Sequence, residues 1–165
     1  MTQAPSRRTL FLTAGAVALT GCAPETADAS TRQYANSPFR RVRDAQWRQR
    51  LPRAAYDVLR HEATERPGSS PLNNESRRGT FICRGCDLPL FRSQWKYDSR
   101  TGWPSFYDVI AANIGTKTDY AIGIPRVEYH CARCLGHQGH VFDDGPRPTG
   151  KRYCNNGVAL KFVPA

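Results

Sequence analysis

The chain has 165 residues, and its 24 lysine and arginine residues outnumber 14 acidic ones to give a formal net charge of +10. This length suits one domain with a leader, and 13 glycines and 12 prolines favour turns and short strands over long helices. A basic chain can bind nucleic acid, but no platform of stacking aromatic residues is interleaved with the basic ones, which argues against that class. After the leader, no segment is long and apolar enough to cross a membrane.

Residues 1–21 are predicted to be an export signal. Arg7 and Arg8 precede an apolar run over residues 10–19 that is too short to span a bilayer. The run ends in small residues before Cys22, and the whole segment resembles a twin-arginine export signal joined to a lipoprotein cleavage box. This resemblance implies acylation of Cys22 and a membrane-anchored lipoprotein in the periplasm or cell envelope. An ordinary signal peptide with an incidental cysteine is the alternative.

Residues 22–43 are predicted to be a lipid-anchored, flexible tether, because they are rich in Ala, Thr, Ser and charge and show no apolar periodicity. A basic stretch overlaps the end of this tether and contains Arg40, Arg41, Arg43, Arg48, Arg50 and Arg53. Such a stretch could rest on anionic headgroups near a lipid anchor. A solvated helix face and linker is the favoured interpretation.

The folded domain is predicted to span residues 44–165. Asp44 can cap a short helical turn, and Pro52 suits the first turn of a helix that runs to about Glu62. A loop rich in Pro, Gly, Ser and Asn follows over residues 65–79. Short strand-like runs separated by turn residues then predict a mainly β, antiparallel fold. These runs are residues 80–82, 89–91, 120–122, 127–129, 140–142 and 157–163.

Two C-x-x-C pairs give the strongest spacing signal, and they consist of Cys83, Cys86, Cys131 and Cys134. Two intervening residues let both sulfurs of a pair face one tetrahedral ion, so two pairs predict a four-cysteine zinc site. A filled shell leaves no open position, which makes the zinc structural and disfavours a zinc-dependent hydrolase or deaminase. In an exported protein, disulfides are the alternative. A disulfide within one pair would constrain the chain little, because it closes a very small loop.

Cys154 is left outside both pairs and is the candidate reactive thiol. If residues 151–157 form a strand, then Arg152, Cys154 and Asn156 share one face, because side chains alternate. The positive charge of Arg152 would lower the thiol pKa and raise the thiolate fraction. A lone cysteine is more often a small buried hydrophobe. The polar neighbours on the same face argue against that reading.

Two other segments could complete a site around this thiol. Trp103 lies in a turn framed by glycine and proline and could hold a methyl or thioether group, although a core tryptophan fits equally well. His137 and His140 follow the second cysteine pair and could donate a proton to an oxygen that leaves sulfur. Metal ligation by these histidines is the weaker alternative, because four cysteines already fill the shell.

Together these motifs resemble peptide-methionine (R)-S-oxide reductase, the B-type methionine sulfoxide reductase. The similarity runs from about Trp47 to Phe162 and includes both cysteine pairs and the ordered motifs at residues 101–106, 137–142 and 152–156. It implies a mainly β domain of two antiparallel sheets, the β-tent or Mss4-like fold, with N-terminal helices and a structural zinc.

The resemblance also implies a function, namely thiol-dependent, stereospecific reduction of peptide-bound methionine-R-sulfoxide, which repairs oxidised proteins. Cys154 would attack the sulfoxide sulfur and become a sulfenic acid, while Trp103 would hold the methyl group and help to select the R epimer. The implied catalytic residues are Cys154, His140, His137, Arg152 and Asn156, and the implied substrate-binding residues are Trp103 and Phe106.

The sequence departs from the family pattern in informative places. Many relatives carry a resolving cysteine where this chain has Thr101, so an external thiol of a thioredoxin-like partner is expected to reduce the sulfenic acid directly. Gln138 replaces the leucine that is usual between the two histidines, which concerns substrate preference rather than the reaction. A zinc-ribbon-like binding module without activity is the rival function, but it gives Cys154 and Trp103 no role.

Overall fold

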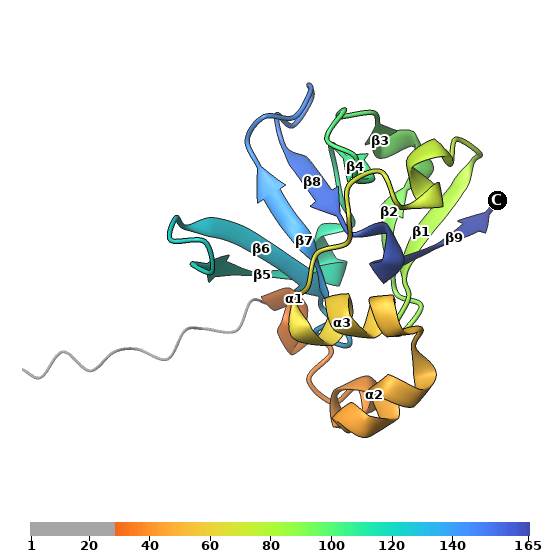
Figure 1. The fold of residues 1–165 in the computed structure, drawn as a ribbon, viewed down its shortest axis with the longest axis vertical. Helices are drawn as coiled ribbons and strands as arrows, with labels where there is room; N and C mark the ends of the chain where they lie inside the picture. The colour runs from red at the N-terminus through yellow and green to blue at the C-terminus, as the bar shows by residue number, and fades with distance from the viewer. Residues whose placement is uncertain (1–28) are drawn as a thin grey trace, which may run out of the picture.

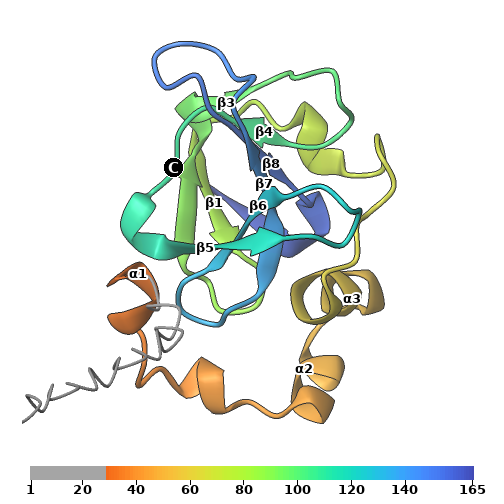
Figure 2. The ribbon, with the colours of Figure 1, turned by 90° about the vertical axis from the view of Figure 1, so that its left-hand side faces the viewer.

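The structure is a computed structural model, and it describes residues 29–165. These residues form two antiparallel β-sheets, with helices α2 and α3 at one end (Figures 1 and 2). The predicted export signal and Cys22 lie outside the described residues. Within this described part, no helix has the length and apolar character needed to cross a bilayer.

Two short helices occupy the described part of the predicted tether, α1 (Ala29–Arg32) and the 3₁₀ helix η1 (Pro38–Arg41). The hydroxyl of Tyr34 donates to the side-chain oxygen of Asn113 at 2.9 Å, and the guanidinium of Arg40 donates to the carbonyl of Ala132 at 2.8 Å. The structure therefore differs from the tether prediction from residue 29 onward. Long-range hydrogen bonds and the packing of Tyr34, Phe39 and Val42 against the core attach this segment to the domain, although its sequence shows no apolar periodicity.

The helices α2 (Asp44–Arg50) and α3 (Arg53–His61) follow where they were predicted. Asp44 is the first residue of α2 rather than its cap, and its carboxylate accepts a hydrogen bond from the Tyr56 hydroxyl of α3 at 2.7 Å. One face of α3 is buried through Ala55, Tyr56, Val58 and Leu59. The chain leaves α3 at Glu62 in a left-handed conformation with φ of 57°, which ends the helix. The following loop contains the 3₁₀ helix η2 (Pro71–Asn74).

Both sheets are antiparallel throughout, which confirms the predicted mainly β fold. The smaller sheet has the order β2–β1–β9, formed by β1 (Gly79–Cys83), β2 (Pro89–Arg92) and β9 (Leu160–Pro164). The larger sheet has the order β3–β4–β8–β7–β6–β5. Its strands are β3 (Lys96–Tyr97), β4 (Ser105–Phe106), β5 (Ile114–Asp119), β6 (Arg126–Cys131), β7 (His137–Phe142) and β8 (Arg152–Asn155). The 3₁₀ helices η3 (Ser93–Trp95), η4 (Ala111–Asn113) and η5 (Gly157–Ala159) complete the fold.

Two of the predicted strands are wrong in their position. Residues 120–122 form the turn between β5 and β6 instead of a strand, and the strand lies just before them. The strand predicted over residues 157–163 begins only at Leu160, because η5 precedes it. The strand expected over residues 151–157 is also shorter than expected, because β8 ends at Asn155 and η5 begins at Gly157. The apolar, strand-like composition of both segments could not reveal the turn at residues 120–122 or the 3₁₀ helix η5.

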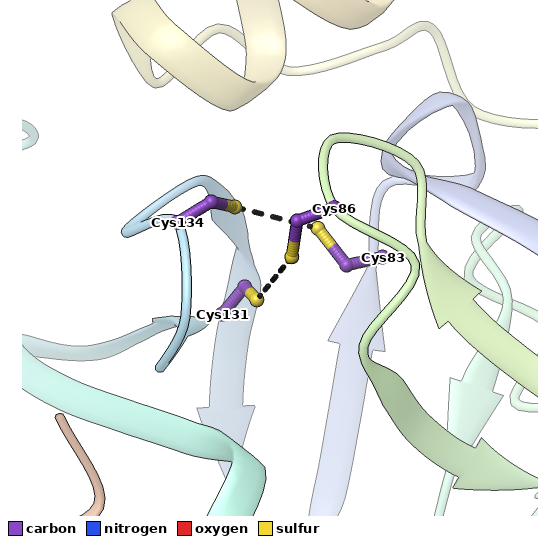
Figure 3. A group of neighbouring side chains, drawn as sticks. All are labelled: Cys83, Cys86, Cys131 and Cys134. Atoms are coloured by element: carbon purple, nitrogen blue, oxygen red, sulfur yellow. Dashed lines mark hydrogen bonds between the residues drawn. The ribbon is translucent and has the colours of Figure 1, made fainter. Parts of the chain in front are cut away.

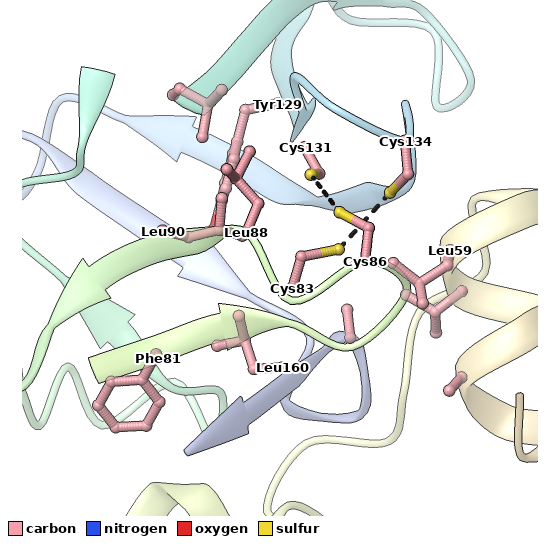
Figure 4. Packing of buried hydrophobic residues seen from close by; sticks show 14 of the residues in the cluster. Leu59, Phe81, Cys83, Cys86, Leu88, Leu90, Tyr129, Cys131, Cys134 and Leu160 are labelled. Carbon is pink, nitrogen blue, oxygen red and sulfur yellow. Dashed lines mark hydrogen bonds between the residues drawn. The ribbon is translucent and has the colours of Figure 1, made fainter. Parts of the chain in front are cut away.

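The aromatic core lies between the two sheets. The ring of Phe106 stacks on Phe91 with centroids 4.1 Å apart and meets the edge of Phe81 at 4.9 Å. All three side chains are completely buried. Figure 4 shows that this core continues past Leu90 and Leu160 to the four paired cysteines and to Leu59 of α3. One continuous core therefore joins the sheets, the helix and the cysteine cluster.

Candidate functional site

Cys154 lies in the middle of the larger sheet. By strand register it is opposite His140 of β7 on one side and Ser105 of β4 on the other. The backbones of β7 and β8 approach closely here, since a Cβ atom added at Gly139 would lie 1.9 Å from the Cys154 carbonyl oxygen. Only glycine can occupy that position without moving the strand that carries the thiol.

A pocket of about 140 Å³ opens beside Cys154. This volume is well above the roughly 10–15 Å³ that one water molecule requires, so the end of a small side chain fits. The lining residues are Thr64, Trp103, Arg126, Gly139, His140, Phe142, Cys154, Asn155 and Asn156. The structure thus brings together four of the predicted site residues, Cys154, His140, Trp103 and Asn156.

Burial and the neighbouring side chains shift the pKa of the Cys154 thiol in opposite directions. Burial raises the pKa of the Cys154 thiol, and this effect outweighs the lowering by the Arg152 guanidinium and by the hydrogen bond with Thr101. Arg152 therefore lowers the pKa of the thiol, as predicted, but burial raises this pKa by more. Thr101 had been singled out only as a missing cysteine, and the structure places its hydroxyl beside the thiol.

Arg152 is fixed by contacts with Asp144 and Phe142. Its guanidinium forms two hydrogen bonds of 2.8 Å to the carboxylate of Asp144. It also lies over the ring of Phe142, 4.3 Å from the ring centroid. A bidentate carboxylate and an aromatic face together restrict the plane of the guanidinium. The positive charge near Cys154 is consequently held in place rather than free to turn toward solvent.

The two predicted histidines have different surroundings. His140 lines the pocket, and its Nε2 atom lies 2.7 Å from the carboxylate of Asp119. Burial lowers the pKa of His140 more than Asp119 raises it. His137 is buried behind His140, with ring centroids 5.5 Å apart, and its Nδ1 atom lies 2.8 Å from Glu128. His140 is therefore the histidine in position to act on a molecule in the pocket.

The backbone of Glu65 connects Trp103 and Asn156, two residues that line the pocket. The indole Nε1 of Trp103 donates to the Glu65 carbonyl at 3.0 Å, and the Glu65 amide donates to the side chain of Asn156 at 3.0 Å. The side-chain amide of Asn156 in turn donates to the Gln138 carbonyl at 3.0 Å. These bonds fix the indole and Asn156 relative to each other, although β8 ends at Asn155 and the predicted shared strand face does not extend to Asn156.

Phe106 does not belong to the pocket. The resemblance implied substrate binding by this residue, but its side chain is completely buried in the aromatic core and does not line the cavity. It follows Ser105 on β4, where side chains alternate, and therefore points away from the face that Ser105 presents to Cys154. Its place in the core is a correction of the sequence-based expectation.

Three residues that shape the site were not singled out as site residues from the sequence. Asp119 and Arg126 pair across the neck of the β5–β6 hairpin, and they were missed because the strand was expected at residues 120–122. Glu65 was assigned to a loop, and nothing in a loop composition reveals a carboxylate that accepts hydrogen bonds from the distant backbone of Gly157 and Val158. Correct placement of the hairpin would have put Asp119 opposite Arg126, but would not have placed either residue beside His140.

The four paired cysteines gather into one buried cluster, as Figure 3 shows. All four sulfur atoms lie within 4.8 Å of one another, and the distances are 3.6 Å for Cys83 to Cys134 and 3.4 Å for Cys86 to Cys131. These separations exceed the disulfide bond length of about 2.05 Å. They approach the roughly 3.8 Å between ligand sulfurs that a tetrahedral ion with Zn–S distances of about 2.3 Å requires.

The chemistry of the cluster also fits a metal ion. Contacts among the four buried thiols shift pKa values in opposite directions, raising the pKa of Cys83 and of Cys134 and lowering that of Cys131. Four thiolates can share this space only with a cation between them. The side-chain amide of Gln138 adds a donor 3.5 Å from the Cys83 sulfur. The cluster can therefore hold a metal ion, as the spacing predicted.

Comparison with known proteins agrees with this geometry. A family model described as the SelR domain matches residues 51–164. A peptide methionine sulfoxide reductase MsrB of Bradyrhizobium diazoefficiens is 48% identical over 122 residues, which cover 73% of this chain and 88% of the relative. The chain belongs to the peptide methionine sulfoxide reductase B family. This is a family of oxidoreductases.

Other relatives in the peptide methionine sulfoxide reductase B family give the same result. The MsrB of Agrobacterium fabrum is 44% identical over 129 residues, covering 78% of this chain and 96% of the relative. The MsrB of Pseudomonas putida is 51% identical over 121 residues, which cover 72% of this chain and 90% of the relative. The family match over residues 51–164 contains the pocket and the cysteine cluster, so the whole described site lies inside the reductase B domain.

Proposed function

We propose that this chain reduces methionine-R-sulfoxide in peptides to methionine and so repairs oxidised proteins. The observation that carries the proposal is a pocket in which Cys154, His140 and Trp103 meet. A thiol supplies the reducing electrons, and the indole offers an aromatic surface to a methyl or thioether group. The family name of the relatives supports the same reaction.

In the proposed reaction, the Cys154 sulfur attacks the sulfur of the sulfoxide. This attack forms an S–S bond. The S–S bond and the S–O bond of the substrate then break as the oxygen moves to the Cys154 sulfur, where it becomes the hydroxyl of a sulfenic acid, and the substrate leaves as a thioether. The thiol proton balances the charge, because it ends on the transferred oxygen. Two electrons pass from the cysteine to the substrate, which places Cys154 on the first step of cysteine oxidation.

The proton transfer is assigned to His140. Burial raises the pKa of the thiol, so the proton must leave Cys154 as the sulfur attacks. The imidazole of His140 lines the same pocket and is oriented by its 2.7 Å contact with Asp119. Arg152 stabilises the negative charge that develops on sulfur, and Thr101 adds a hydroxyl beside it. His137 supports this arrangement from behind His140.

We further propose that an external dithiol of a thioredoxin-like protein regenerates the enzyme. Among the described residues, Cys154 is the one cysteine outside the buried cluster, and Thr101 occupies the place beside it. The first thiol of the partner would displace water from the sulfenic acid and form a mixed disulfide. The second thiol would then release reduced Cys154.

A stereospecific assay tests the reaction. A peptide with one methionine-R-sulfoxide and its S epimer are each incubated with the described domain and a dithiol. Turnover of the R epimer alone is expected, with loss of turnover in Cys154→Ser and unchanged folding by circular dichroism. Equal turnover of both epimers, or full activity of Cys154→Ser, would contradict the proposal. A sulfenic-acid probe should label Cys154 after one turnover without dithiol.

Zinc is the proposed occupant of the cysteine cluster. Cys83, Cys86, Cys131 and Cys134 would hold it, and a shell of four thiolates gives it a structural role. The proposed site of action is the cell envelope, with an anchor on Cys22. Mass spectrometry of Cys22 and the membrane fractionation of Cys22→Ser test the anchor, which should be lost in that variant.

A further inference from the structure

An unusual apolar surface lies on the β5–β6 hairpin, and residues 120–127 are called here the hairpin tip. Within residues 29–165 it carries four of the six large apolar side chains that are exposed. These four are Tyr120 (67% exposed), Ile122 (59%), Ile124 (61%) and Val127 (48%), whereas Leu135 and Val163 lie on other elements. Single exposed apolar residues are ordinary, but a group of them marks an interaction surface.

The base of the hairpin is part of the pocket wall. Asp119 and Arg126 are directly paired in the strand register and form an ion pair of 2.5 Å at the neck of the hairpin. The same carboxylate of Asp119 contacts His140, and Arg126 itself lines the pocket. Any chain that places a side chain in the pocket therefore passes close to the hairpin tip.

The hairpin tip has a defined turn that presents its apolar side chains outward. The amide of Ala121 donates to the Asp119 carboxylate at 2.8 Å, and the amide of Gly123 donates to the Tyr120 carbonyl at 2.9 Å. Gly123 has a φ of 81°, a conformation that favours glycine. In Figure 1 the hairpin projects away from the body of the domain. The apolar side chains are thus displayed rather than folded back on the sheet.

We infer that the hairpin tip binds apolar residues that flank methionine sulfoxide in an oxidised, partly unfolded polypeptide. This inference rests on the proposed function. Methionine is mostly buried among apolar residues, and its oxidation to a polar sulfoxide disrupts such packing. The neighbours of a sulfoxide in a damaged protein are therefore apolar and exposed. The pocket admits only the end of one side chain, so these neighbours must lie on the adjoining surface.

The charges of the hairpin favour a polypeptide over a lipid surface. Anionic headgroups would need free cations beside the apolar tip. Lys117 of β5 is paired with Glu62, and Arg126 of β6 is paired with Asp119. The cations of this hairpin are therefore engaged within the protein.

The test compares three substrates that each carry one methionine-R-sulfoxide. One is the capped single amino acid, one is a peptide with leucine and valine on both sides of the sulfoxide, and one is the same peptide with serine at those positions. The variant Ile122→Ser/Ile124→Ser is compared with Val163→Ser, a control with a similarly exposed apolar side chain on β9. Circular dichroism and urea unfolding verify that both variants fold.

The double variant should lose about tenfold in kcat/KM for the apolar peptide, which corresponds to about 1.4 kcal/mol. It should retain its activity on the capped amino acid and the serine peptide, and Val163→Ser should match the unmodified protein on all three. Equal kcat/KM of the double variant and the unmodified protein on the apolar peptide would overturn the inference. So would a loss of binding to anionic vesicles without any change in peptide kinetics. Failure of the unmodified protein on every substrate would instead refute the proposed function.

Discussion

The carboxylate of Glu65 provides a sensitive test of how the segment after Cys154 is held. Its two oxygens accept hydrogen bonds from the amides of Gly157 and Val158, with a distance of 3.1 Å to Val158. These amides begin the turn that follows Asn156. Replacing Glu65 by alanine would leave both buried donors without an acceptor.

The expected loss follows from these two donors. A buried donor without a partner costs about 1–3 kcal/mol, so Glu65→Ala should lower the free energy of unfolding by about 3 kcal/mol. Burial raises the pKa of Glu65 despite its two backbone hydrogen bonds, which shows that the negative charge itself is poorly accommodated. Glu65→Gln keeps one acceptor oxygen without the charge and should therefore cost only about 1 kcal/mol.

Urea unfolding followed by circular dichroism measures both variants. The midpoint should fall while the slope with denaturant stays constant, since the buried surface is unchanged. Glu62→Gln is the matched control, because Glu62 forms only an exposed ion pair with Lys117 and such pairs contribute little. A loss below about 0.5 kcal/mol in Glu65→Ala would refute the reasoning. An equal loss in Glu65→Gln would show that a single neutral acceptor oxygen does not replace the carboxylate.

Phe106→Leu should destabilise the core by about 1–2 kcal/mol in urea unfolding and leave KM unchanged; a raised KM would return Phe106 to the substrate site. Gln138→Met should raise the melting temperature, because the buried Oε1 of Gln138 has no hydrogen-bond partner; a lower melting temperature would mean that its contact with Cys83 matters more. Chelation with a metal-specific dye readout should release one metal ion and unfold the domain together; a folded, metal-free domain would disprove the structural role. Burial alone would raise the pKa of Glu128, but hydrogen bonds with His130 and His137 outweigh it and hold the pKa at about 2. Stability from Glu128 should therefore be complete above pH 4.5 and be lost as the pH falls toward about 2, and acid unfolding of Glu128→Gln should lack this contribution.

The sequence by itself determined the local chemistry of the site. The spacing of the two cysteine pairs predicted the cluster, because two residues between cysteines already turn both sulfurs toward one point. The ordered motifs around Trp103, His140 and Cys154 predicted three residues that line one pocket. Short runs separated by turn residues predicted an antiparallel, mainly β fold. Each cysteine pair and each strand-like run depends on neighbours in the chain, which a sequence displays directly, whereas the common site of Trp103, His140 and Cys154 was implied by the family resemblance.

The tertiary structure alone decided which distant groups complete that chemistry. The contact of Asp119 with His140 depends on where one hairpin turns, and an apolar run at residues 120–122 gave the wrong place for the strand. The burial of Phe106 depends on which face of β4 meets the other sheet. The packing of residues 29–43 depends on long-range hydrogen bonds and on the contacts of Tyr34, Phe39 and Val42 with the core. Such contacts join residues far apart in the chain, and no local pattern of residue types encodes them.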